Sequence, residues 1–105
     1  MTKAVDVFQG LVHERGDLLR RLTFEQLIQP EVRKVEYVAV ESRRGRITTI
    51  VDQGTLPSGG IRVVVQGFLK KRFLPTAWNV ALDGFYKYPD ETTAPLTRED
   101  MWEFD

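Results

Sequence analysis

The sequence predicts an α+β fold, in which N-terminal helices pack on a four-stranded antiparallel meander sheet and a short helix ends the chain. Apolar residues first recur at helical spacing and then alternate in β-branched runs. The connections between these runs are too short for parallel crossovers. With 105 residues, the chain has the length of one domain. We therefore expect a single domain, 1–105, with a helical segment at 1–30, the sheet at 32–89 and a short helical tail at 95–105.

Two helices are expected before the sheet. Ala4, Phe8 and Leu11 share one helix face. Gly16 costs about 1 kcal/mol relative to alanine inside a helix, so the first helix can break near this residue. Thr23 and Gln26 have the spacing of a capping box, which predicts the start of a second, short helix.

Four runs with β-strand character follow the helices. They lie around residues 35–40, at 46–52, at 61–69 and at 80–88. Ser42-Arg43-Arg44-Gly45 is expected to form the first turn, with Gly45 in the position that favours glycine. Gly67 and Gly84 are expected nearly opposite each other in the last hairpin, where bare backbone can seat a bulky side chain.

Composition excludes several kinds of chemistry. There is no cysteine, so disulfides, thiolate catalysis and Cys-ligated metals are ruled out. The single histidine, His13, cannot build a histidine metal site by itself. We expect no metal and no cofactor. No apolar run is long enough to span a membrane, and we expect a soluble, cytoplasmic protein without a membrane partner.

The formal net charge of zero hides a segregation of charge along the chain. Residues 1–30 carry four basic and four acidic groups, residues 31–72 carry nine and four, and residues 73–105 carry two and seven. In an antiparallel sheet, the turn after the first strand and the end of the third strand lie at the same end. We therefore expect one basic rim there, made of Arg43, Arg44, Arg46, Lys70, Lys71 and Arg72. Phe73 and Trp78 are expected beside it.

The basic rim suggests a binding function. Our leading hypothesis is a non-catalytic interaction module that contacts an acidic protein partner or associates with itself. The alternative is a nucleic-acid-binding protein that uses the same rim, although zero net charge disfavours unspecific phosphate binding. The acidic C-terminal segment could instead fold back and neutralise the rim.

Self-association is a separate expectation. An open four-stranded sheet has two free edges, and apolar residues are expected on both of its faces. If Val35, Ile47 and Val63 face the helices, the other face carries too much apolar surface to stay exposed. Its residues would be Val38, Val40, Ile50, Val64 and Phe68.

Asp83 is the one carboxylate that suggests catalysis. It sits in the middle of a strand between apolar neighbours, and burial there would raise its pKa and suit acid–base chemistry. The simpler interpretation, which we favour, is that Asp83 and Lys87 point to solvent from one face of the strand. A carboxylate-dependent enzyme is therefore the third hypothesis.

Overall fold

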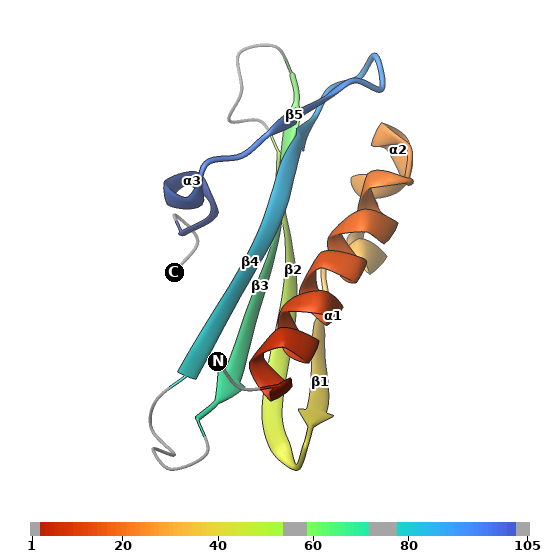
Figure 1. Ribbon diagram of the computed structural model, residues 1–105. Coiled ribbons are helices and arrows are strands. Elements are labelled where there is room, and N and C mark those ends of the chain that lie inside the picture. Colours follow the sequence, from red (N-terminus) through yellow and green to blue (C-terminus); the bar gives the residue numbers. More distant parts are fainter. Residues whose placement is uncertain (1–2, 54–58, 72–77, 103–105) are drawn as a thin grey trace.

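The structure is an antiparallel sheet with one long helix across one face and a short helix on the other (Figure 1). It is a computed structural model that describes residues 3–53, 59–71 and 78–102. The helices are α1 (Lys3–Arg20), α2 (Phe24–Leu27) and α3 (Arg98–Trp102), with one 3₁₀ turn, η1 (Pro30–Val32); the strands are β1 (Val35–Val40), β2 (Arg43–Gln53), β3 (Ile61–Lys70), β4 (Trp78–Lys87) and β5 (Thr93–Pro95).

The predicted fold class is confirmed, but the sheet has five strands instead of four. The strand order is β1-β2-β3-β4-β5, and every neighbouring pair is antiparallel. The fifth strand spans only Thr93–Pro95, and it pairs with the end of β4. Three residues are too few to show an alternating pattern, and for this reason the sequence did not reveal it.

The first hairpin turns two residues earlier than predicted. Val40 pairs with Arg43, so the loop consists of Glu41 and Ser42, which have φ angles of 50° and 67°. Positive φ at both loop residues matches the twist of a hairpin and defines a tight turn of the I′ kind. Gly45, predicted to lie in this turn, is buried inside β2, where an added Cβ would lie 3.0 Å from the ring of Phe8.

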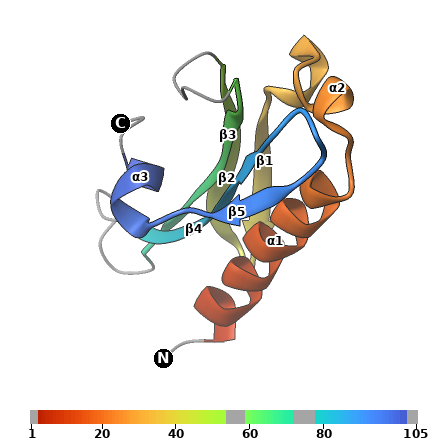
Figure 2. The ribbon, with the colours of Figure 1, turned by 90° about the horizontal axis from the view of Figure 1, so that it is seen from above.

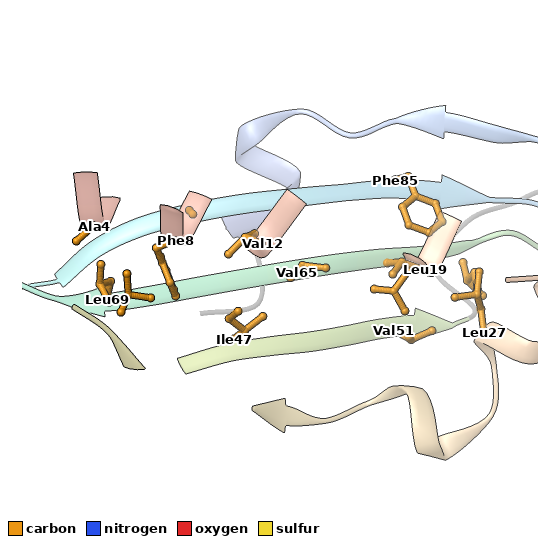
Figure 3. Packing of buried hydrophobic residues seen from close by; sticks show 14 residues of the cluster. Ala4, Phe8, Val12, Leu19, Leu27, Ile47, Val51, Val65, Leu69 and Phe85 are labelled. Carbon is orange, nitrogen blue, oxygen red and sulfur yellow. The ribbon is translucent and has the colours of Figure 1, made fainter. Parts of the chain in front are cut away.

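Helix α1 continues through Gly16 without the break that the sequence allowed. Phe8 and Val12 pack over the bare backbone of Gly67, and an added Cβ there would lie 2.5 Å from Val12. Figure 3 shows these side chains within the apolar layer between the helix and the strands. After α1, Thr23 and Gln26 form both bonds of the predicted capping box.

Alternation along the strands defines two faces, which we call the helix face and the open face. The helix face packs against α1 and includes Ile47, Val65 and Phe85. Val38 and Val40 also lie on it, whereas Val35 lies on the open face. The expected distribution of these three valines was therefore wrong. Both faces of the first strand carry apolar residues, so the pattern did not distinguish them.

Helix α3 covers only part of the open face (Figure 2). Thr97 caps it by accepting a bond from the backbone N–H of Asp100. Leu96 and Met101 lie over Gly84, where an added Cβ would meet Leu96 at 2.8 Å. Gly84 pairs with Val64 and faces α3, whereas Gly67 faces α1. The two glycines are therefore not opposite each other as predicted.

Two glycines of α1 give a matched test of this packing. An added Cβ at Gly10 meets nothing within 4 Å, whereas one at Gly16 would lie 2.0 Å from Oδ2 of Asp83. We expect Gly10→Ala to raise the free energy of unfolding by about 0.5–1 kcal/mol through helix propensity. Gly16→Ala should lower it instead, because the helix or the carboxylate must move. Urea unfolding of both variants measures the difference, and two stabilising substitutions would contradict the close approach at Gly16.

Candidate functional site

A row of side chains crosses the open face from β1 to β4. The register pairs Tyr37 with Arg46, Arg46 with Phe68, and Phe68 with Val80. Directly opposite residues point to the same side of a sheet, and four neighbouring strands span about 14 Å. The row therefore presents one aromatic ring at the sheet border and another near its middle, with a cation between them.

Two cations of this surface are held against aromatic rings. The guanidinium carbon of Arg46 lies 5.3 Å from the centroid of the Phe68 ring, and Nζ of Lys70 lies 6.0 Å from that of Trp78. The two rings meet edge to face at a centroid distance of 6.5 Å. Each cation–π contact contributes about 0.5–1 kcal/mol at an exposed site. The two contacts therefore hold the charged groups of Arg46 and Lys70 against the rings.

The outer members of the group are accessible. Tyr37 is 81% exposed, and Trp78 is 43% exposed. Arg44 and Arg46 are also exposed. We call the set Tyr37, Arg44, Arg46, Phe68, Lys70 and Trp78 the aromatic–basic patch.

Carboxylates are scarce around the patch. Among the residues of β1 to β4 on the open face, Asp52 is the one acid, and its carboxylate accepts a bond of 2.9 Å from Arg62. The described part of the acidic C-terminal segment lies on the same half of the face as Arg62. There, the carboxylate of Asp100 accepts a bond from the hydroxyl of Tyr86, and its backbone carbonyl accepts one from Arg62. In the described part of the tail, this carboxylate is therefore engaged beside Tyr86 and makes no contact with the cations of the patch.

The residues predicted for the basic rim do not all lie together in the structure. Arg44, Arg46 and Lys70 belong to the aromatic–basic patch, and Lys71 is exposed just after β3. Arg43 alternates onto the helix-face side, where its Nε donates to the carbonyl of Lys70 at 2.8 Å. Arg72 and Phe73 lie outside the described residues.

Sequence reasoning did not include Tyr37 and Phe68 among the site residues. Tyr37 was not singled out in its strand, and Phe68 was expected on the apolar face that a second copy or the tail would cover. The signal that could have included them is register, since matching the strands places both beside Arg46. The register of a hairpin depends on the exact position of its turn, and the predicted turn lay two residues too late.

Asp83 lies on the helix face, only 8% exposed, in contact with α1. Its two oxygens accept bonds from the guanidinium of Arg20 at 2.6 and 2.9 Å, and the backbone N–H of Gly84 donates to it at 2.8 Å. Nδ1 of His13 lies 3.5 Å from the same carboxylate. Gly16 makes room for this group on the helix surface. The expectation of a solvent-facing Asp83 and Lys87 was wrong, because both are buried on the face that α1 covers.

Burial and ion pairing act on Asp83 in opposite directions. Burial alone raises its pKa, but the hydrogen bonds and the charge of Arg20 outweigh this effect, so the pKa of Asp83 lies below its usual range. The same bonds raise the pKa of Arg20. A lowered pKa keeps the carboxylate ionised, whereas general acid catalysis requires a raised one. The contacts favour a role in holding α1 against β4.

Metal binding finds no support in the described part of the chain, where no group of three or more histidine, aspartate or glutamate side chains could hold an ion. Within the same residues, no helix is long and apolar enough to cross a membrane.

No protein-family model matches this chain, and neither a curated protein nor a solved structure is significantly similar to it.

The ion pair of Asp83 makes stability depend on pH. Because its pKa is lower in the folded than in the unfolded state, its contribution is complete above about pH 4 and is lost as the pH falls further. We expect Asp83→Asn to lower the free energy of unfolding by about 2–3 kcal/mol at pH 7. This is less than for a fully buried pair, since the Arg20 side chain is 35% exposed. The variant should also lose less stability than the wild type between pH 5 and about pH 3.

Asp17→Asn is the matched control, because Asp17 bonds to the same Arg20 from an exposed position. It should change the free energy of unfolding by less than about 0.5 kcal/mol. Urea unfolding at several pH values measures both variants. Equal effects of the two substitutions would contradict a specific role for Asp83.

Proposed function

We propose that this chain is a non-catalytic binding module that docks an acidic protein surface on its aromatic–basic patch. The observation that carries the proposal is Arg46, a cation held over Phe68 and flanked by the largely exposed Tyr37. Tyrosine, tryptophan and arginine are the residues that dominate the energetics of protein interfaces. A patch that combines all three, on strands β1 to β4 whose one open-face acid, Asp52, is bonded to Arg62, suits a partner that supplies the acids.

The contacts of the rings favour protein over nucleic acid. Proteins that bind single strands offer open ring faces on which bases stack. Here the faces of Phe68 and Trp78 are approached by Arg46 and Lys70 of the same chain, which leaves Tyr37 as the freely exposed ring. A carboxylate needs only the cation, and it can bond to a guanidinium in a bidentate manner without displacing the ring. The covered ring faces therefore favour an acidic protein over a nucleic acid, although both would be attracted by the same positive charge.

The patch also disfavours direct face-to-face packing of two copies. Such packing would bring Arg44, Arg46 and Lys70 of each copy toward the same cations of the other, and like charges in contact oppose association. A different protein that presents carboxylates between apolar side chains avoids this repulsion. The exposed ring of Tyr37 can then contact the apolar side chains of that partner.

Binding of a labelled peptide of alternating Glu and Leu residues tests the proposal. We expect Arg44→Glu/Arg46→Glu to weaken binding at least about tenfold and to flatten its salt dependence. Tyr37→Ala should weaken binding while the salt dependence stays the same, because it removes apolar contact without changing charge. Fluorescence anisotropy at several salt concentrations measures both effects.

Lys3→Glu/Arg21→Glu is the matched control, since it changes the net charge equally at two exposed positions away from the open face. It should leave the affinity unchanged. Labelled oligothymidylate provides the comparison with nucleic acid and should bind more weakly than the peptide. Tighter binding of the oligonucleotide, or equal effects of both double variants, would overturn the proposal.

A further inference from the structure

The outer edge of β1 is the border of the sheet, and none of the described strands pairs with it (Figure 1). The backbone N–H of Thr49 donates to the carbonyl of Lys34 at 2.9 Å, which identifies the ladder position at which β1 bonds to β2. In an antiparallel ladder, every second residue bonds to the same neighbour. Continuing by the register, Glu36, Val38 and Val40 bond toward β2. The N–H and C=O groups of the alternate residues therefore point outward.

These outward residues are Val35, Tyr37 and Ala39. All three are exposed, so a further strand would find their backbone groups accessible. The strand holds neither proline nor lysine, two of the devices that keep an edge from pairing. Its one inward-pointing charge, Glu36, is neutralised by Arg15 at 2.7 Å.

We infer that a second copy of this chain pairs with this edge, β1 against β1 in antiparallel orientation, to form a two-fold symmetric dimer with a continuous sheet. The two-fold axis passes through Tyr37, which pairs with Tyr37 of the second copy. Val35 then lies opposite Ala39 of the second copy. Every residue in these pairs points its backbone bonds outward, so each pair can exchange two hydrogen bonds.

Opposite charges at the two ends of β1 favour this register over registers shifted by one or two residues. With Tyr37 on the axis, Arg33, which precedes β1 in one copy, comes near Glu41, the first residue of the turn after β1 in the other copy, and both residues are exposed. A shift by two residues in either direction separates these opposite charges. A shift by one residue matches outward groups with inward ones and cannot form the ladder.

The other border of the sheet fits a symmetric partner less well. The end of β4 is covered by β5, which finishes in Pro95. The earlier part of β4 pairs only with β3, but its one charged residue, Asp83, is bonded to Arg20 and offers no opposite charge to a second copy. Pairing of β1 with β4 of another copy would not close on itself and would produce open-ended assemblies.

The dimer does not depend on the proposed docking function, but it would enlarge the surface that is available for docking. Edge pairing leaves the open face free, because the added strand lies in the plane of the sheet. Two aromatic–basic patches would join across the axis, with the two Tyr37 rings side by side at the centre. Helix α1 packs mainly against β3 and β4, away from the new border.

Sedimentation velocity over a range of concentrations tests the inference on the full chain. We expect the wild type to change from monomer to dimer as the concentration rises. Arg33→Glu and Glu41→Arg should each weaken the dimer about tenfold, because each places like charges opposite each other at two symmetric positions. The double variant Arg33→Glu/Glu41→Arg should restore the wild-type affinity, and Arg21→Glu is the control for net charge.

Ala39→Pro supplies a second, independent test. Its N–H points outward, so proline removes a dimer bond without removing a bond to β2. The variant should be monomeric with an unchanged circular dichroism spectrum. If it fails to fold, the charge-swap series decides alone. A wild type that stays monomeric at millimolar concentration, a double variant that is not restored, or open-ended assemblies would overturn the inference.

Discussion

The position of α1 on the sheet depends on the ion pair between Asp83 and Arg20. Gly16 has no side chain where the carboxylate approaches the helix, and so the two elements come close enough for both oxygens to bond to the guanidinium. A charge this deeply buried must be paired, which restricts the helix to one rotation and one height on the strands. The apolar contacts of Phe8 and Val12 over Gly67 complete the same packing.

Helix α1 packs mainly against β3 and β4 on one face of the sheet, and the candidate site lies on the opposite face. Helix α3 lies over the half of that face around Gly84, where the carboxylate of Asp100 accepts a bond from Tyr86 and its backbone carbonyl accepts one from Arg62. The other half keeps its cations and aromatic rings. Within the described residues of this face, the cations of the patch therefore lie apart from the carboxylates of Asp52 and Asp100.

Much of the fold could be predicted from the sequence, since it depended on local signals. The capping box at Thr23, the cap at Thr97 and the strand alternation are properties of neighbouring residues. The predictions for Gly45 and Gly84 were wrong for different reasons. Glycine marks either a turn or a close approach, and only the packing of Phe8 shows that Gly45 is the second. Gly84 does lie in its predicted strand, but the register pairs it with Val64 and not with Gly67. The cations of the candidate site were predicted from the sequence. Tyr37 and Phe68 could be added only once the strand register was known.

By itself, the sequence determined the order of the helices and the four long strands, the antiparallel meander and the separation of charge along the chain. Short turns and residue periodicity suffice for these properties, because they involve residues close in the chain. Only the tertiary structure decided which face of the sheet α1 covers, and therefore that Asp83 is buried and Tyr37 exposed. Both faces carry apolar residues, so the choice depends on contacts between a helix and strands some sixty residues apart, such as Arg20 with Asp83 (63 residues).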